Sequence, residues 1–147
     1  ASGNSRVTES SGTVTAMTKA TGKRFYKIEV PRATASTSNA MTGSQENGTI
    51  FYTHQIVLPL NKRDADTRNL VSTLAKNRCT FVTLEMDGTY RMFGKDFGLM
   101  LDSTEAGSGT AAGDRNGYML TFTSVEKDDL LIVSSSVAAA LETPGGA

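Results

Sequence analysis

The chain has 147 residues, which is the size of one domain with a single core. Its 15 basic residues balance 15 acidic ones, so the composition gives no electrostatic reason to expect nucleic-acid binding, and a neutral surface favours self-association. The single cysteine excludes a disulfide framework within the chain. No apolar run reaches the roughly 18 residues that span a bilayer, and residues 1–6 lack the apolar stretch of a signal peptide.

The first third of the chain is polar, with one clear strand signal in it. Residues 1–22 are mostly Ser, Thr and Gly, so we expect a flexible arm or a strand that pairs only with a partner. Residues 25–30 alternate between apolar and polar side chains, which predicts a half-buried strand. Residues 32–48 cannot pack a core by themselves, so we predict a long loop that orders against another subunit.

Residues 48–60 carry the longest strand signal. Both faces of this segment hold bulky side chains, which predicts a central strand. Pro59 has no N–H to donate to a neighbouring strand, so we expect the last residues to lie at a sheet edge or beyond it.

Residues 66–76 predict a helix. Its apolar side chains form one narrow stripe: Leu70, Val71, Leu74 and Ala75. A helix of this length is marginal alone, so we expect it to lie on a sheet. Asp64 or Asp66 suits its N-terminal cap, and Asn77 suits a left-handed residue at its C-terminus.

The last part of the chain contains a strong turn signal and several strand signals. Asp87-Gly88 predicts a type I′ hairpin between strands at residues 79–86 and 89–93. Residues 102–117 predict a second long loop. The alternating or apolar segments predict three further strands, at residues 97–101, 118–123 and 130–133.

Together these signals predict about seven strands and one helix. The expected fold is mainly β, of the α+β kind: a two-sheet sandwich or small barrel with one flanking helix and long loops. We expect the domain to cover residues 23–133, with a flexible or partner-bound arm at residues 1–22 and a flexible tail at residues 134–147.

His54 and Cys79 are the residues whose types most often carry catalysis. His54 is the only histidine in the sequence and has no carboxylate or cysteine at metal-ligand spacing, so we interpret it as a hydrogen-bonded or interface histidine. Cys79 is interpreted as a small buried apolar residue at a strand start, and no pattern places His54 beside it.

Three short motifs suggest chemistry but lack its context. Residues 95–98 contain the Asp-Phe-Gly tripeptide of protein kinases, without the glycine-rich and catalytic loops that would give it that meaning. Residues 107–113 lack both the dinucleotide-binding spacing and the Lys-Ser/Thr of a P-loop, so they predict a flexible loop. Asp64 and Asp66 lack the remaining ligands of an EF-hand.

Basic residues gather loosely around the predicted helix: Lys62, Arg63, Arg68, Lys76, Arg78 and Arg91. Asp64, Asp66 and Glu85 interrupt them, which is typical of ordinary surface charge and not of a phosphate-binding face. Asp128 and Asp129 indicate a solvated turn. The sequence therefore predicts no catalytic, cofactor-binding or metal-binding residue.

Several segments, taken in order, carry a resemblance to a known family. They are residues 25–30, 46–57, 70–76, 86–90, 93–94, 107–109 and 113–123. The ordered set, which spans about three-quarters of the chain, resembles the tail-tube-like proteins of tailed bacteriophages and prophages, especially those of Bacteroides-type hosts.

This resemblance implies two packed sheets, a flanking helix and a long loop. It also implies hexameric rings that stack into a hollow tube in the virion tail, with one sheet of each subunit lining the lumen through which the viral genome passes. Such a protein is assembled in the cytoplasm of the host bacterium and has neither catalytic residues nor a cofactor. Its partners would be other tail or neck proteins, the DNA passing through without sequence-specific binding, and further copies of the chain, reached through residues 32–48 and 102–117.

Other functions fit the same pattern. A capsid-decoration or adhesion module would share the β-rich body and neutral charge, but would bind a capsid or a host glycan without stacking on itself. The tail-tube fold also serves in neck, tail-completion and baseplate proteins. A small hydrolase would use His54 with an acidic partner.

Overall fold

The computed structural model describes residues 7–18, 25–31, 34–111, 113–114 and 116–142. Parts of the expected arm and tail, at residues 1–6, 19–22 and 143–147, lie outside the described residues, as do residues 32–33, 112 and 115 of the two expected loops.

The described residues form two sheets and two helices. One sheet has five strands in the order β1 (Val7–Ser10), β2 (Thr13–Met17), β9 (Leu131–Val133), β6 (Tyr90–Phe93) and β5 (Phe81–Leu84). The other has four strands in the order β3 (Ser36–Ser44), β4 (Thr49–Leu60), β8 (Gly117–Glu126) and β7 (Met100–Gly107). The helices are α1 (Ala65–Lys76) and α2 (Ser135–Glu142). The expected mainly β fold of two sheets with a flanking helix is confirmed.

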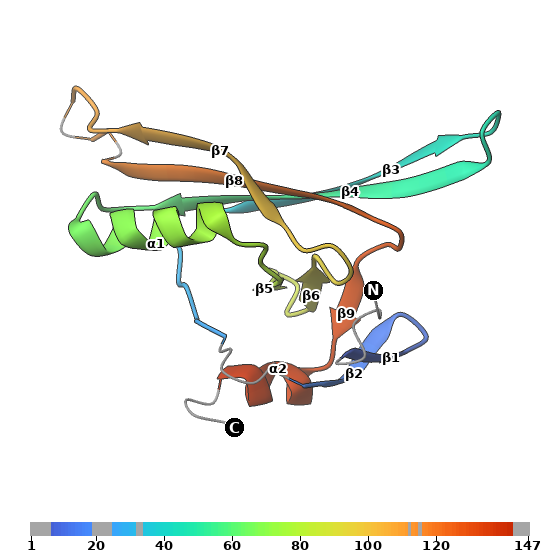
Figure 1. The fold of residues 1–147 in the computed structure, drawn as a ribbon. Helices are drawn as coiled ribbons and strands as arrows, with labels where there is room; N and C mark the ends of the chain where they lie inside the picture. The colour runs from blue at the N-terminus through green and yellow to red at the C-terminus, as the bar shows by residue number, and fades with distance from the viewer. Residues whose placement is uncertain (1–6, 19–24, 32–33, 112, 115, 143–147) are drawn as a thin grey trace.

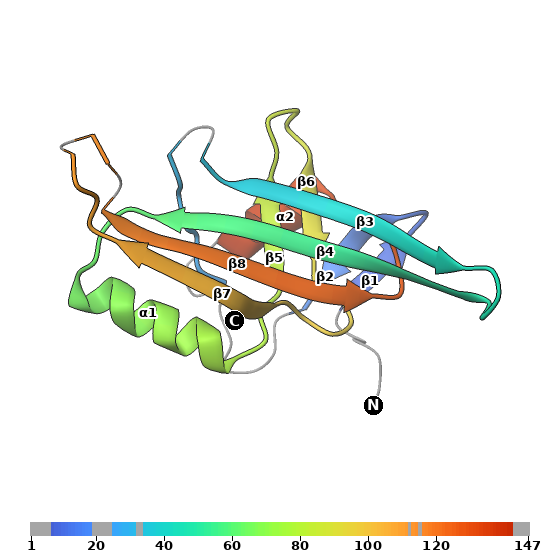
Figure 2. The same ribbon diagram turned by 90° about the horizontal axis from the view of Figure 1, so that it is seen from above.

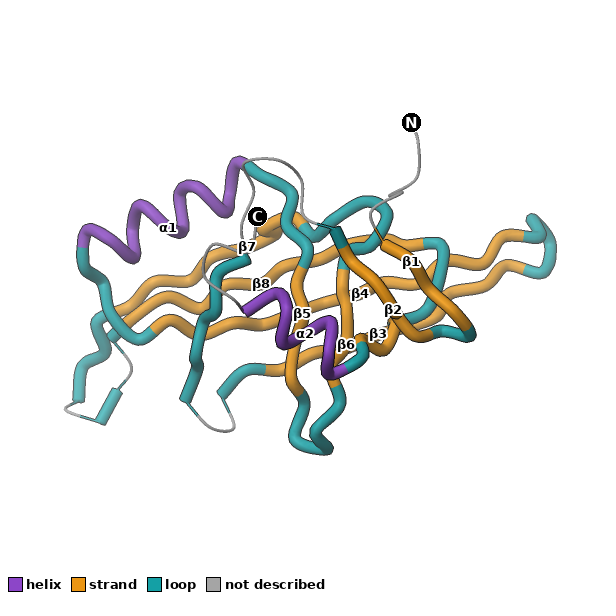
Figure 3. Tube along the Cα trace, turned by 90° about the horizontal axis from the view of Figure 1, so that it is seen from below, coloured by secondary structure: helices purple, strands orange, loops and turns teal. Residues whose placement is uncertain are grey.

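The two sheets face each other, and the short strands of the five-stranded sheet run across the long strands of the four-stranded sheet (Figures 1 and 2). Figure 3, seen from below, shows α2 in front, on the face of the five-stranded sheet that points away from the four-stranded sheet. It also shows α1 beside β7. The β3–β4 hairpin extends well beyond the rest of the molecule (Figure 1).

The main core lies between the sheets. Alternation on β4 and β8 turns Ile56, Leu58, Leu120 and Phe122 toward the five-stranded sheet, where they meet Phe93. Burial of such side chains stabilises the fold by about 1.5–3 kcal/mol each.

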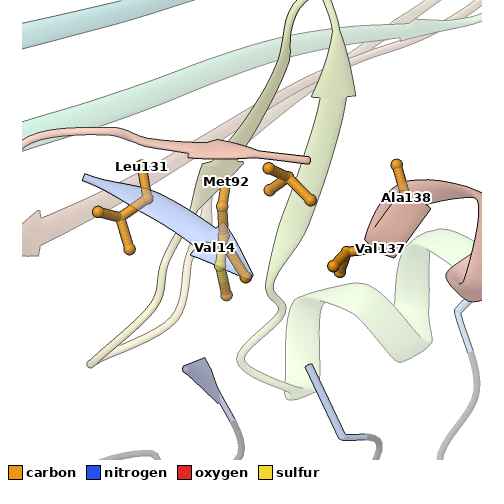
Figure 4. Packing of buried hydrophobic residues seen from close by; sticks show 6 residues of the cluster. Val14, Met92, Leu131, Val137 and Ala138 are labelled. Carbon is orange, nitrogen blue, oxygen red and sulfur yellow. The ribbon is translucent and has the colours of Figure 1, made fainter. Parts of the chain in front are cut away.

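A second core lies between the five-stranded sheet and α2. It consists of Val14, Met92, Leu131, Val133, Val137 and Ala138, which Figure 4 shows from close by. Two expectations are therefore corrected. The arm contains a hairpin, β1–β2, whose β2 pairs in parallel with β9, and the tail contains α2. The sequence does not predict these elements because both segments consist largely of Ser, Thr and Ala, and only a few apolar side chains in each reach the core.

Residues 25–30 form no strand, contrary to the sequence prediction. Ile28 and Val30 pack against the core between the sheets, whereas Tyr26 is 82% exposed. The alternation at residues 25–30 therefore reflects the contact of Ile28 and Val30 with the core. It does not reflect pairing with a neighbouring strand.

The two predicted long loops are also corrected, because each contains a strand. Residues 32–48 include β3, which pairs with β4 over its whole length, and residues 102–117 include most of β7, which pairs with β8 and begins later than the strand expected at residues 97–101. Backbone hydrogen bonds hold both strands in place although most of their side chains are exposed.

The local signals around α1 and the β5–β6 turn are partly confirmed. The Asp64 side chain accepts a hydrogen bond from the backbone N–H of Thr67 at 2.8 Å, as an N-cap should. Asn77 has a φ of −124°, so the left-handed C-terminus is wrong.

The prediction of a type I′ hairpin turn at Asp87-Gly88 is also wrong. Only Gly88 has a positive φ in this turn, of 82°, and its N–H donates to Glu85 O. These contacts define a three-residue hairpin loop with Gly at the left-handed position.

Candidate assembly surface

β3 and β7 are the two edge strands of the four-stranded sheet, and the outward side of each pairs with no strand among the described residues. Their lengths are similar, 9 and 8 residues. β3 contains neither a charged residue nor a proline, and nearly all of it is exposed. A long, neutral edge is a template for pairing with another chain, since its outward N–H and C=O groups have no partner.

The two edges are offset along the strand direction. β3 lies opposite residues 49–57 of β4. β7 lies opposite residues 117–123 of β8, and that part of β8 faces residues 55–60 of β4. The sheet is therefore a slanted parallelogram. Pro59 lies where β4 has already lost β3 as a neighbour, which agrees with the expectation for its missing N–H.

The outer face of this sheet is crossed by no described element, as Figure 2 shows. The strand register places on it mainly hydroxyl, amide and small side chains, among them Ser38, Thr53, Gln55, Thr121 and Thr123. Glu105 is the one charged side chain of the four strands on this face, apart from Asp102, which lies in a bulge. The face is thus neutral to weakly acidic.

The end of the β3–β4 hairpin exposes apolar side chains on both of its faces. Met41 and Ile50, on one face, are each 64% exposed, and Phe51, on the other, is 38% exposed. Single exposed apolar residues are ordinary, but three on one projecting hairpin mark a surface suited to contact with another protein.

His54 lies on the inner face of β4 and is buried. Neither of its ring nitrogens has a hydrogen-bond partner among the described residues, and its ring meets Phe93 edge-on at 5.8 Å between centroids. Burial lowers the pKa of His54, while the negative charges of Glu126 and Asp129 act in the opposite direction. Of the two predicted roles, a hydrogen-bonded or an interface histidine, the first is not met among the described residues and the second stays a prediction. The buried ring is not exposed to a substrate in solvent.

Glu126 is the buried charge that sequence reasoning missed. It accepts hydrogen bonds from the backbone N–H of Asp96 at 3.1 Å, from that of Phe97 at 3.3 Å and from Ser124 Oγ at 2.7 Å. It thereby holds residues 95–98, which contain the kinase-like tripeptide at 96–98, as a structural loop. The available signal was a carboxylate at an inward position of an alternating strand, where an unpaired charge would be costly.

The remaining candidates from the sequence have structural roles. Cys79 is half-buried and bridges to Leu99 through backbone hydrogen bonds, and burial raises the pKa of its thiol. Within residues 107–114, Asp114 accepts hydrogen bonds from the backbone N–H groups of Ala111 and Thr110, which lower its pKa. No group of three or more potential metal ligands comes together among the described residues.

Described residues line two open hollows on the surface. The first, about 430 Å³, lies at the start of α1 and is lined by residues that include Val30, Leu60 and Lys62. The second, about 420 Å³, lies at the β7–β8 end of the sheet. Neither is lined by His54, Cys79 or Glu126.

At 12 and 8 residues, α1 and α2 fall short of a membrane-spanning helix, and no other helix occurs in the described residues. Comparisons of the chain with protein-family models, with curated proteins and with solved structures gave no match.

Proposed function

We propose that this chain is a non-enzymatic structural protein of a bacteriophage virion that assembles into rings, stacked as the tail tube through which the genome is delivered. The observation that carries the proposal is the four-stranded sheet with two long, open and offset edges and an uncovered outer face. The ordered sequence resemblance gives the proposal its viral context and a hexameric ring.

Strand direction supports ring closure through these edges. All three pairings in the four-stranded sheet are antiparallel, so β3 and β7 run in opposite directions. In a ring, all copies point the same way, and β7 of one copy therefore lies antiparallel to β3 of the next. The alternation continues without a break, as a head-to-tail interface requires.

The offset of the two edges supports a closed barrel. Full pairing of β7 with the next copy's β3 shifts each copy along the strand direction. Repeated around a ring, such a shift tilts the strands relative to the ring axis, and a sheet closes into a barrel only when its strands are tilted. Closure would give the outward N–H and C=O groups of both edge strands a partner.

The outer face would line the lumen, because the inner face packs against the five-stranded sheet. Hydroxyl and amide groups, with Glu105 and Asp102 as the charged residues of these strands near the face, offer no cationic sites for phosphates. DNA would pass such a wall without being held.

Contacts between rings would use the two ends of the sheet. The β3–β4 hairpin projects at one end with Met41 and Ile50 exposed, and the described residues of the β7–β8 loop, 108–111, 113–114 and 116, lie at the other (Figure 1). The β3 half of the hairpin, with Met41, and the β7–β8 loop fall within the residues 32–48 and 102–117 that the sequence suggests as partner contacts, whereas Ile50 lies just outside them. Copies already held in a ring present several such contacts at once, which offsets the entropy of ordering them.

Electron microscopy of the purified protein at rising concentration tests the proposal. We expect rings or stacked tubes with a central channel. A protein that remains a monomer under all conditions, or that binds preformed capsids without associating with itself, would contradict it.

A further inference from the structure

The two sides of the four-stranded sheet differ in what lies beyond the edge strand. Figure 2 shows the β5–β6 turn reaching past β3 on one side and α1 lying beyond β7 on the other. The turn is tied to β3 by a hydrogen bond from Thr37 Oγ1 to Glu85 Oε1 at 3.4 Å. An overhanging turn beside one edge and a helix beside the other would lie near each other if β3 and β7 of neighbouring copies paired.

The turn presents an apolar tip in an acidic setting. Met86 is 87% exposed and Leu84 is 61% exposed. Glu85 and Asp87 lie beside Arg91, with contacts of 2.8 and 3.7 Å, and Asp129 adds a third negative charge to the same neighbourhood. Arg91 balances only one of these three carboxylates, so this group of four side chains is net negative.

The helix side is net positive. Residues 62–78 contain five basic residues and two acidic ones, Asp64 and Asp66. Arg63, Arg68 and Lys76 are exposed, and no carboxylate makes an ion-pair contact with them in the part of the chain that the structure describes. Leu70, 39% exposed on α1, offers an apolar surface among them.

We propose that, in the ring described above, the β5–β6 turn of each copy docks against α1 of the next copy, with Met86 on the helix surface and the acidic residues facing Arg63, Arg68 and Lys76. This inference rests on the proposed ring. The pairing of β3 with the next copy's β7 brings the overhanging turn toward the helix that borders β7. The basic residues around the helix thereby acquire a role: they recognise a second copy and fix the direction of assembly.

Charge reversal gives the first test. Arg68→Glu with Lys76→Glu places like charges opposite the turn, and we expect the concentration needed for half-assembly to rise by about tenfold or more. Lys127→Glu, a reversal on the β8–β9 loop, is the matched control and should leave that concentration nearly unchanged. If both variants assemble like the parent protein, the helix contact is wrong.

Cross-linking of mixed variants gives the second test, in a Cys79→Ala background. One preparation carries Met86→Cys and the other Arg68→Cys, and a short bismaleimide cross-linker is added. We expect covalent dimers only in the mixture, and a ladder of larger species when both substitutions share one chain. Mixing Met86→Cys with Ser10→Cys, at the end of β1, should give none.

The outcomes separate this inference from the proposed function. Rings in the microscope without Met86–Arg68 dimers would overturn the docking contact and leave the ring in place. Dimers without closed rings would keep the contact and contradict the tube. The absence of both would contradict both proposals.

Discussion

The five-stranded sheet is covered on both faces, by the four-stranded sheet on one side and by α2 on the other. The four-stranded sheet has longer strands, yet only its inner face is covered, and its β3–β4 hairpin extends past the core. One sheet completes a protomer, while the other has an outer face and two edges for which a single copy offers no partner in the described residues. This difference indicates that protomer stability and assembly depend on separate residues, and substitutions can test that separation.

The largest effect on the protomer is expected from Phe122→Ala, which empties the core between the sheets. Phe122 is completely buried on the inner face of β8, so we expect a loss of about 3–5 kcal/mol in the free energy of unfolding. Chemical denaturation measures it. Val125, three residues along the same strand but 54% exposed on the outer face, provides the control, and Val125→Ala should change stability by less than about 0.5 kcal/mol. Equal losses would show that the outer face is also covered.

A smaller loss is expected from Glu126→Ala. The substitution leaves the N–H groups of Asp96 and Phe97 without their acceptor, which should cost about 2–3 kcal/mol and speed amide exchange in residues 95–98. Glu105→Ala, on the exposed outer face, should be nearly neutral in the same assay. Unchanged exchange in residues 95–98 would show that Glu126 does not hold this loop.

His54 should make the protomer less stable in mild acid. Its pKa is lowered from 6.5 in the folded chain by burial, so the unfolded chain binds the proton more readily. The stabilisation from neutral His54 is complete above the pKa of the unfolded chain, about 6.5, and is lost as the pH falls toward the lower pKa of the folded chain. In that range the free energy of unfolding should fall by at most about 1.4 kcal/mol per pH unit. Urea unfolding at several pH values measures the slope. His54→Phe should remove this part of it, and a slope that is unaltered would rule out His54 as its source.

The smallest effect on the protomer, with a full effect on assembly, is expected from one proline on the β3 edge. Of two consecutive strand residues, one directs its N–H to β4 and the other to the free edge. In the pair Ala40→Pro and Met41→Pro, one variant should therefore destabilise the protomer. The other should keep its unfolding free energy and lose ring formation. If both prolines permit assembly, β3 is not part of the interface.

The sequence predicts elements that place several large apolar side chains in a core and misses elements that place few or none there. The inward alternation of Ile56 and Leu58 predicts β4, and the stripe of Val71 and Leu74 predicts α1. β3 carries no charged residue and only one large apolar residue, Met41, so its composition resembles a loop, although its nine residues all pair with β4. The same reason explains the missed N-terminal hairpin.

The candidate surface was less predictable than the fold. The sequence suggests residues 32–48 and 102–117 as partner contacts because both segments are polar and long. Whether a strand lies at an edge depends on sheet order, and sheet order follows from long-range pairing such as that of Gln55 with both Ser38 and Thr123. Glu126 could be suspected from its inward position, but its partners come from a loop about thirty residues away in the chain.

Amide hydrogen exchange, compared between the dilute protomer and the assembled protein, tests the edge-pairing account most directly. If the edges pair between copies, assembly slows exchange at alternate amides of β3 and β7, which are the amides that point away from β4 and β8. The amides of β6 and β9 should exchange at nearly the same rate in both states. Equal exchange of β3 and β7 in the two states, in a sample that electron microscopy shows to be assembled, would contradict it.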